Sequence, residues 1–305
     1  MKGSAIEYTV KKTTGYLRLM RPANIVTSIA DVLAGVAISG YFTNLSNHLQ
    51  NLMPVLLLCL STIGLYGGGV VFNDVFDAEL DLVERPERPI PSGLVSKREA
   101  AMLGGVLLVI GIMVAFLVSL TSGLLAFFVA VSALVYDRWG KHQSFLGPVN
   151  MGLCRGLNLL LGISAVPLEL QNTWYLAFVP IIYIASITMI SRGEVHGGSK
   201  LTLYIAALFY AVVFTCILCF SFVIGNLFFV LIFLLPFAWM IFKPLFAAIK
   251  DPAGKNISRA VKAGVLALIL MNAAWAAAFG AVYVALIIVI LLPISLKLGR
   301  LFAVT

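Results

Sequence analysis

Residues 73–81 read Asn-Asp-Val-Phe-Asp-Ala-Glu-Leu-Asp, and they end a long hydrophobic segment. At about 100° per helical residue, Asp74 and Asp81 project in almost the same direction and Asp77 lies on the same face. Carboxylates so close repel one another, so they persist where a membrane segment meets water only with something cationic between them. Oxygen ligands suit Mg2+, which usually bridges carboxylates to substrate phosphates. The stretch therefore predicts a membrane helix that ends in a metal site, in an enzyme acting on a phosphorylated substrate.

The composition shows that this chain folds in a lipid bilayer. Hydrophobic residues make up 61% of the 305 residues and charged residues 11%, against roughly 45–50% and about 25% in soluble proteins. About ten apolar segments are long enough to span a membrane: 23–41, 53–73, 100–120, 122–136, 145–165, 173–192, 201–223, 226–247, 260–278 and 280–297. We expect an all-α, polytopic transmembrane bundle of nine to ten spans around a central cavity. It forms a single domain over residues 1–305, in which 280–300 is an extra C-terminal span.

The last two spans are the hardest to separate. Residues 260–296 contain few polar residues that would mark a loop. At about 1.5 Å per residue, however, a single helix of that length would be roughly twice as long as the hydrocarbon core is thick. A turn near Gly280 is therefore expected.

Basic residues are confined to alternate connections. Lys and Arg precede the first span and then cluster at 85–98, 138–141, 192–200, 243–262 and 297–300, whereas 41–53, 119–123, 166–172 and 224–227 contain none. The positive-inside rule then predicts an integral cell-membrane protein with both termini and all charged connections in the cytoplasm. Topology, together with attraction to anionic lipid and to a polyanionic substrate, explains the net charge of +8 without a nucleic-acid partner.

A proline-rich loop follows the acidic run directly. Residues 84–93 read Glu-Arg-Pro-Glu-Arg-Pro-Ile-Pro-Ser-Gly, and the prolines cannot continue the helix. They hold Arg85 and Arg88 near the carboxylates, and guanidinium groups bind phosphate oxygens well. Acids for a metal beside arginines for phosphate predict a diphosphate site. The alternative is a solvated loop whose charges only follow the topology.

The order N-D-x-x-D-x-x-x-D, followed by R-x-x-R-P-x-P-S-G, resembles the first aspartate-rich motif of the UbiA superfamily of intramembrane prenyltransferases. The resemblance runs from Arg18 to about residue 278. It implies a helical bundle, usually of nine spans, whose cavity opens sideways to lipid. It also implies that Mg2+, held by two acidic motifs, binds an isoprenyl diphosphate whose allylic cation is joined to an acceptor. Carried onto this chain, the metal and diphosphate residues are Asn73, Asp74, Asp77 and Asp81.

The end of the fourth span carries a similar family element. Residues 136–141 read Tyr-Asp-Arg-Trp-Gly-Lys and resemble a Tyr/Lys element of the family whose spacing is often one residue shorter. Lys141 and Arg138 are candidates to grip phosphate oxygens, and Tyr136 to stabilise the leaving group or the cation. The alternative for Tyr136 and Arg138 is an aromatic and basic anchor at the membrane interface.

Two charged residues lie well inside the predicted spans. Arg155 is near the middle of the fifth span, where an isolated arginine costs on the order of 2.5–3.5 kcal/mol. Asn150 and Asn158 fall within the same polar wedge of that helix, and the first span carries a stripe that includes Asn24 and Asp31. An Asp31–Arg155 ion pair and a polar acceptor pocket are both consistent with this pattern, and neither excludes the other.

The chain departs from the family after the sixth span. Where members usually carry a second D-x-x-x-D run, residues 190–200 read Ile-Ser-Arg-Gly-Glu-Val-His-Gly-Gly-Ser-Lys, with Glu194 as the only acid. Glu194 is a candidate single metal ligand because it shares a helix face with Tyr183 and Ser186, which are expected to face the cavity. Side chains that could meet phosphate directly are Arg192, His196 and Lys200. His196 is equally consistent with a loop histidine, and the segment resembles a divergent branch such as the UbiA-like EboC type.

The predicted activity is Mg2+-assisted transfer of an isoprenyl group from an isoprenyl diphosphate to an acceptor that the sequence does not identify. A terpene cyclase would use the same diphosphate site without an acceptor. A transporter or a non-catalytic lipid-binding member would also keep charges inside the membrane.

Overall fold

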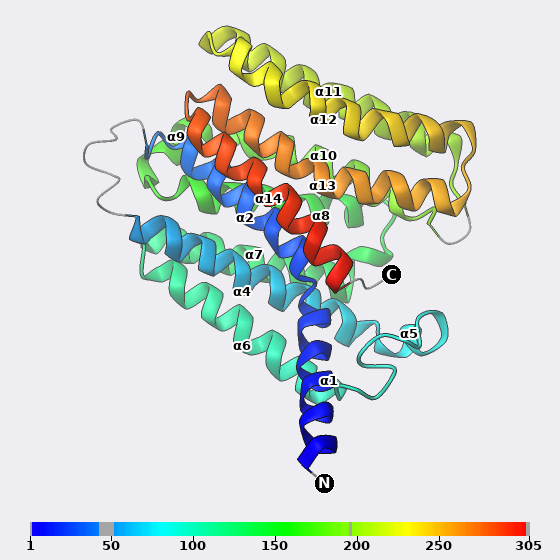
Figure 1. Ribbon diagram of the computed structural model, residues 1–305. Coiled ribbons are helices and arrows are strands. Elements are labelled where there is room, and N and C mark those ends of the chain that lie inside the picture. The colour runs from blue at the N-terminus through cyan, green and yellow to red at the C-terminus, as the bar shows by residue number, and fades with distance from the viewer. Residues whose placement is uncertain (1, 43–51, 195–196, 303–305) are drawn as a thin grey trace.

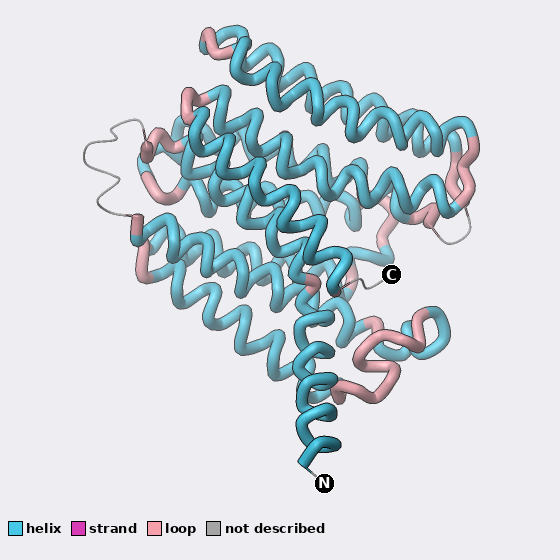
Figure 2. The backbone as a smooth tube through the Cα atoms, in the orientation of Figure 1, coloured by secondary structure: helices cyan, strands magenta, loops and turns pink. Residues whose placement is uncertain are grey.

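The computed structural model describes residues 2–42, 52–194 and 197–302, and every regular element among them is a helix. The elements are α1 (Lys2–Met20), α2 (Pro22–Ile38), α4 (Met53–Phe76), α5 (Ala78–Glu84), α6 (Lys97–Phe116), α7 (Leu120–Arg138), η1 (Gly140–His142), α8 (Leu146–Ile163), η2 (Pro167–Glu169), α9 (Leu170–Thr173), η3 (Trp174–Ala177), α10 (Phe178–Ser191), α11 (Lys200–Ile224), α12 (Leu227–Lys250), α13 (Gly254–Ala278) and α14 (Val282–Leu301). Helices make up almost all of the chain trace, and the loops that join them are mostly short (Figure 2).

Eight helices of the described chain are long and apolar enough to cross a membrane, or up to nine if α1 and α2, bent by 42°, form one span. The protein is therefore an all-helical, polytopic membrane bundle, as predicted. Helix occupies each of the ten predicted segments. The expected turn between the last two spans lies at Gly280, whose φ of 80° is readily adopted only by glycine.

The bundle is layered. Figure 1 shows α11 and α12 as a pair on one outer side, α6 on the opposite side, and α10, α13, α2 and α4 between them. α2 packs against α4, α8, α13 and α14. Because α2 touches four neighbours, residues on several of its faces are buried, and this helix positions most of the interior polar groups.

Glycines bring α2 and α8 close together. A Cβ on Gly35 would overlap the Leu159 carbonyl oxygen, and a Cβ on Gly162 would overlap the Val32 carbonyl oxygen. Small residues allow two membrane helices to approach backbone to backbone. This approach places the buried polar side chains of the two helices within hydrogen-bonding distance.

The bend between α1 and α2 is local. Arg21 adopts φ 48° and ψ 66° immediately before Pro22, the first residue of α2. It is the one non-glycine residue with positive φ in the part of the chain that the structure describes. A left-handed conformation costs such a residue of order 1–3 kcal/mol, and here it directs the Arg21 side chain toward the end of α4.

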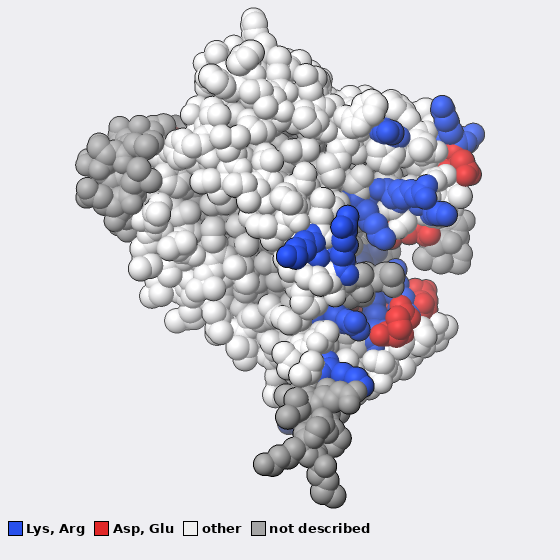
Figure 3. Space-filling view, viewed as in Figure 1, with Lys and Arg blue, Asp and Glu red and all other residues white. Residues whose placement is uncertain are grey.

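The charged residues gather at one end of the bundle. In the view of Figure 3, Lys, Arg, Asp and Glu lie on the side that holds α5, the α10–α11 connection and the C-terminal end of α14, while none is visible on the opposite side, although Glu169 in η2 belongs to that other end. This is the one-sided distribution expected from the sequence. That this end faces the cytoplasm stays a prediction.

Candidate active site

The acidic run spans a break between two helices. α4 ends at Phe76, Asp77 has φ −86° and ψ 0°, and α5 begins at Ala78. The chain keeps a nearly helical course, because the Asp81 N–H donates to the Asp77 carbonyl at 2.8 Å. Asp74 and Asp81 are 3% and 4% exposed, so both carboxylates are buried and need a charge partner.

Basic side chains neutralise these carboxylates. Arg88 Nη1 lies 2.6 Å from Asp81 Oδ2 and 3.2 Å from Asp74 Oδ1. Asp77 pairs with Lys141. The proline-rich loop thus returns Arg88 to the acidic run, as the sequence predicts, and one guanidinium bridges Asp74 and Asp81. Arg85, predicted beside it, forms no ion pair with these carboxylates in the described chain.

Arg21 is a site residue that the sequence analysis counted only among the topology charges. Its Nη2 lies 2.5 Å from Asp74 Oδ1. The sequence feature that could have indicated a role in the site is the position of Arg21 immediately before Pro22, at the start of the first span. The contact depends on the bend at that residue, which spacing along the chain does not reveal.

Two buried donors at this cluster have no hydrogen-bond partner, the Nε atoms of Arg21 and Arg88. Buried polar atoms are nearly always paired, so each unpaired one calls for an explanation. An anion seated between these guanidinium groups would accept from both. The unpaired donors therefore fit a diphosphate.

The donor set also fits Mg2+, although the site is not preassembled. Among the described residues no three Asp, Glu, His or Cys side chains are gathered around a common point as metal ligands would be. Carboxylate oxygens are nevertheless the ligands that Mg2+ prefers, and it is commonly bound through one or two carboxylates together with substrate phosphates. The carboxylates that now face arginine and lysine would have to turn toward the metal.

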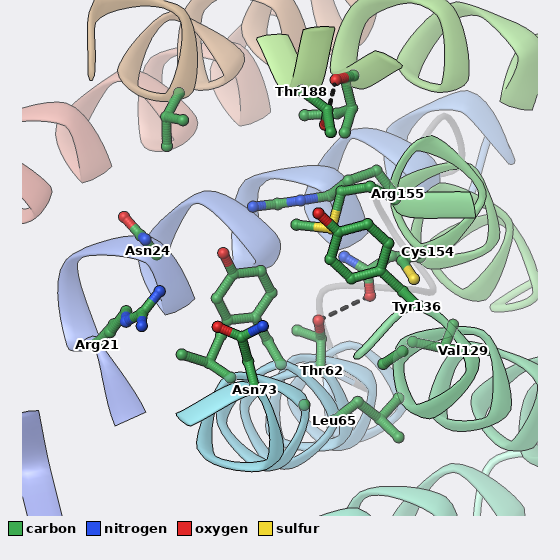
Figure 4. A pocket seen from close by; sticks show the side chains of 18 of the residues that line it. Arg21, Asn24, Thr62, Leu65, Asn73, Val129, Tyr136, Cys154, Arg155 and Thr188 are labelled. Atoms are coloured by element: carbon green, nitrogen blue, oxygen red, sulfur yellow. Dashed lines mark hydrogen bonds between the residues drawn. The ribbon is translucent and has the colours of Figure 1, made fainter. Parts of the chain in front are cut away.

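A cavity of about 290 Å³ opens inside the bundle beside this cluster. Most of its wall is apolar, and its polar lining residues are Arg21, Asn24, Thr62, Tyr66, Asn73, Tyr136, Asp137, Arg155, Asn158 and Thr188. Figure 4 shows Arg21, Asn24 and Asn73 at one edge of the cavity, with Tyr136 and Arg155 pointing into it from α7 and α8. This polar edge lies at the start of α2 and the end of α4, and Arg21 connects it to the carboxylate cluster through its contact with Asp74. The carboxylates themselves and their partners Arg88 and Lys141 are not among the cavity-lining residues of the described chain.

The residues at the end of α7 separate into two groups. Tyr136 and Asp137 line the cavity, and Asp137 accepts a 2.9 Å hydrogen bond from Asn73. Arg138 instead lies over the ring of Phe76, with its Cζ 5.8 Å from the ring centroid, and it is exposed. Arg138 does not line the cavity of the described chain, and whether it binds phosphate or anchors the membrane interface stays a prediction.

The Asp31–Arg155 ion pair is present in the bundle interior. Arg155 Nη1 lies 2.7 Å from Asp31 Oδ2, and its Cζ lies 4.7 Å from the centroid of the Tyr66 ring. Asn158 donates to Asp31 at 3.2 Å and accepts from Thr62 at 2.7 Å. Since Arg155 and Asn158 also line the cavity, the ion pair and an acceptor pocket remain compatible.

Two asparagines differ from expectation. Asn272 of α13 donates to Asp31 Oδ1 at 2.7 Å. This contact was not predicted from the sequence, because α13 and α2 meet only in the folded chain. Asn150 was expected to face the pocket with Arg155. It is not among the cavity-lining residues of the described chain, and its side-chain amide lies against α7 near Gly140.

The face of α10 was assigned wrongly from the sequence. Tyr183 does not face the cavity: it donates to the Gly264 carbonyl at 2.7 Å and stacks on Tyr210 with 5.1 Å between ring centroids. Ser186 is also absent from the cavity lining, to which α10 contributes Ile184, Ile187 and Thr188. The periodicity of an almost uniformly apolar helix does not show which face meets the cavity.

Glu194 follows α10 and is half-buried. Burial raises the pKa of its carboxyl above the ordinary value, while nearby Arg85 and Lys262 act to lower that pKa. Arg85 therefore lies within electrostatic reach of Glu194, and the loop after the first acidic run approaches the segment that replaces the second.

The remaining basic residues of this segment are placed differently. Arg192 donates to the carbonyl oxygens of Gln143 and Ser144 at 2.5 and 2.8 Å, so its guanidinium anchors the loop before α8. Lys200 is exposed at the first turn of α11. His196 lies outside the described residues.

Residues 32–263 match the model of the UbiA prenyltransferase family. The match covers most of the chain, and the chain belongs to this family. One relative, the digeranylgeranylglyceryl phosphate synthase of Methanothrix thermoacetophila, is 34% identical over 152 residues, which are 50% of this chain and 55% of the relative. The chain spans about half the length of the curated relatives that it matches.

Solved structures share the fold. A UbiA homologue from Aeropyrum pernix K1 in its apo state has a TM-score of 0.67 at 18% identity, over 82% of this chain and 96% of that chain. A UbiA homologue from Archaeoglobus fulgidus bound to GPP and Mg2+ has a TM-score of 0.55 at 14% identity, over 88% of this chain and 99% of that chain.

Proposed function

We propose that this protein is an intramembrane prenyltransferase that moves an isoprenyl group from an isoprenyl diphosphate to an acceptor. The observation that carries the proposal is a carboxylate cluster joined to a largely apolar cavity by Arg21, which lines the cavity and pairs with Asp74, with unpaired Nε atoms on Arg21 and Arg88. Two likenesses support it. The relative from Methanothrix thermoacetophila is named a digeranylgeranylglyceryl phosphate synthase, and the homologue from Archaeoglobus fulgidus was solved with GPP and Mg2+.

Candidate residues to hold Mg2+ are Asp74, Asp77, Asp81 and Glu194. When bound, the metal ion supplies positive charge that neutralises the departing diphosphate. Arg88 and Arg21 would direct their Nε–H groups to phosphate oxygens, and Lys141 would turn from Asp77 to a third oxygen. Such fixed donors stabilise charge that develops on a leaving group.

The cavity wall would hold the isoprenyl chain and keep water away from the allylic cation, so that the acceptor meets it first. The bond from the allylic carbon to the diphosphate oxygen breaks, its electrons leave with the diphosphate, and the acceptor forms the new bond and loses a proton. Tyr136 lines this space from α7 and would stabilise the cation or the leaving group. Arg155, Asn158 and Asn24 line the same cavity and are the candidates to orient a polar acceptor.

The charged end of the bundle would face the cytoplasm, where isoprenyl diphosphates dissolve. The positive-inside rule supports this orientation, because the Lys- and Arg-bearing connections lie at that end. Both termini are then cytoplasmic, in a protein integral to the cell membrane.

The test is to incubate purified protein in lipid nanodiscs with radiolabelled isoprenyl diphosphates of several chain lengths, with Mg2+ or with EDTA. We expect diphosphate release that requires Mg2+ and rises when a lipid extract containing acceptors is added. Rapid release that needs no acceptor, with a cyclic hydrocarbon product, would identify a terpene cyclase instead. Absence of any release would remove the prenyltransferase assignment.

A further inference from the structure

Asp137, near the end of α7, is a buried acid to which the sequence analysis assigned no role. Its side chain is 4% exposed, and it is the one acidic residue that lines the 290 Å³ cavity in the described chain. Asn73 Nδ2 donates to Asp137 Oδ1 at 2.9 Å, while Lys141, Arg21 and Asp77 lie within electrostatic reach of the Asp137 carboxyl. The hydrogen bond with Asn73 is therefore its specific contact at the edge of the candidate active site.

This hydrogen bond fixes the direction in which the Asn73 amide faces. A carboxylate accepts hydrogen bonds and an amide oxygen cannot donate one, so Asn73 turns its NH2 group toward Asp137. The amide oxygen, Oδ1, then faces away from Asp137. In the part of the chain that the structure describes, Asn73 Oδ1 accepts no hydrogen bond, and Asn73 lines the cavity (Figure 4). The oxygen is left available to a ligand.

Asn73 also lies beside a candidate metal ligand. Side chains four residues apart on a helix are neighbours, so Asn73 and Asp77 project from the same side at the end of α4. The Asp77 N–H donates to the Asn73 carbonyl at 3.0 Å, which continues the helical hydrogen bonding between them. Carboxylate and carbonyl oxygens suit Mg2+ and Mn2+, and the available Asn73 oxygen therefore suits the same metal ion as Asp77.

Two links join the end of α4 to the end of α7 and the turn that follows it. Asn73 meets Asp137, and Asp77 pairs with Lys141, four residues further along both segments. A diphosphate competes for the second link, because it attracts the Lys141 ammonium. It does not compete for the first link, which contains no basic side chain. The Asn73–Asp137 link can therefore persist while the carboxylates turn toward a metal.

We propose that Asp137 is a positioning residue that holds the Asn73 amide with its oxygen toward the Mg2+ accompanying the diphosphate. In this role Asp137 does not touch the metal and acts through Asn73. The partners that orient metal ligands typically change metal affinity by roughly 10–100-fold. The inference rests on the proposed function, because it concerns the metal site of that reaction.

The test measures Mn2+ affinity by electron paramagnetic resonance on full-length protein in nanodiscs, with a non-hydrolysable isoprenyl diphosphate analogue present, so it needs no turnover. Asp137→Ala removes the hydrogen-bond acceptor, whereas Asp137→Asn removes the charge and keeps an acceptor oxygen. Both are also made in an Asn73→Ala background. The matched control is Thr188→Val, because Thr188 lines the same cavity while its hydroxyl donates within its own helix, to the Ile184 carbonyl at 2.9 Å.

We expect Asp137→Ala to bind Mn2+ about tenfold more weakly than the wild type does. Asp137→Asn keeps most of the affinity, because its amide oxygen can still accept from Asn73, and Thr188→Val binds as the wild type does. In the Asn73→Ala background Asp137→Ala causes no further loss, since residues that act as one unit are not additive. Denaturant titration of each variant checks that the bundle is folded.

Three results would overturn the inference. The first is wild-type Mn2+ affinity in Asp137→Ala. The second is an equal loss in Asp137→Ala and Asp137→Asn, which would mean that the charge matters and the hydrogen bond does not. The third is a full further loss from Asp137→Ala in the Asn73→Ala background, which would mean that Asp137 acts without Asn73. Failure of the proposed function is distinguishable, because the wild type itself would then gain no Mn2+ affinity from the analogue and would release no diphosphate.

Discussion

Asp31→Asn is the substitution that most directly tests whether the buried polar network stabilises the bundle. The Asp31 carboxylate is 1% exposed. It receives hydrogen bonds from Arg155 at 2.7 Å, from Asn272 at 2.7 Å and from Asn158 at 3.2 Å. Because every one of these partners is a donor, the NH2 group of an asparagine at this position would face a donor on one side.

The expected cost follows from the charge left behind. Arg155 is 4% exposed, and removing one member of a buried ion pair typically costs about 3–5 kcal/mol because the other charge stays buried without compensation. Asparagine has nearly the same volume as aspartate, so no cavity adds to this loss. The double variant Asp31→Asn/Arg155→Met removes both charges and should recover most of the lost stability, since replacing a whole buried pair by apolar groups is often neutral.

The assay is the free energy of unfolding from denaturant titration in detergent micelles, with Thr62→Val as the matched control. Thr62 donates one neutral hydrogen bond to Asn158 in the same network, so its removal should cost about 0.5–1.5 kcal/mol. The reasoning is refuted if Asp31→Asn costs no more than Thr62→Val, or if the double variant is less stable than Asp31→Asn alone.

Three further predictions concern catalysis and topology. Asp77→Ala should abolish diphosphate release and leave the unfolding free energy close to that of the wild type, because Asp77 lies at the partly exposed break between α4 and α5; full activity of this variant would remove it from the metal site. Glu194→Gln should raise the Mg2+ concentration needed for half-maximal activity, since an amide oxygen is a poorer ligand for a hard cation. An unshifted Mg2+ titration, together with weaker diphosphate binding by Arg192→Ala, would favour direct phosphate contacts in this segment. Finally, a cysteine at Arg300 should react with a membrane-impermeant reagent only from the cytoplasmic side, and labelling from outside would reverse the orientation.

The parts of the fold that follow from local hydrophobicity could be predicted. Runs of apolar residues located the helices in all ten predicted segments, of which eight or nine qualify as spans and α8 does not. The limit on helix length placed the turn at Gly280, where the structure has φ 80°. Arg88 could also be anticipated near the acids, because prolines restrict where a short loop can lead. In each case the deciding interactions lie within a few residues of one another.

The parts that depend on how helices pack could not be predicted. Asn272 meets Asp31 across 241 positions of the chain, and Arg21 reaches Asp74 because of a bend that brings the start of α2 toward the end of α4. Tyr183 was wrongly predicted to face the cavity. Because α10 is almost uniformly apolar, the helices packed around it decide which of its faces lines the cavity. These contacts depend on how the helices pack against one another, and the hydropathy pattern of a sequence does not report that packing.

The most direct test of the central claim is to measure Mn2+ binding by electron paramagnetic resonance, as a visible substitute for Mg2+, with and without a non-hydrolysable isoprenyl diphosphate analogue. Arg21, Arg88 and Lys141 pair with the three carboxylates. A diphosphate that takes these basic side chains would release the carboxylates for the metal, so metal and diphosphate should bind together. We predict weak Mn2+ binding alone, strong binding with the analogue, and loss of that gain in Asp81→Asn. Equal Mn2+ affinity with and without the analogue, or a gain that survives in Asp81→Asn, would contradict the assignment of this cluster as a metal–diphosphate site.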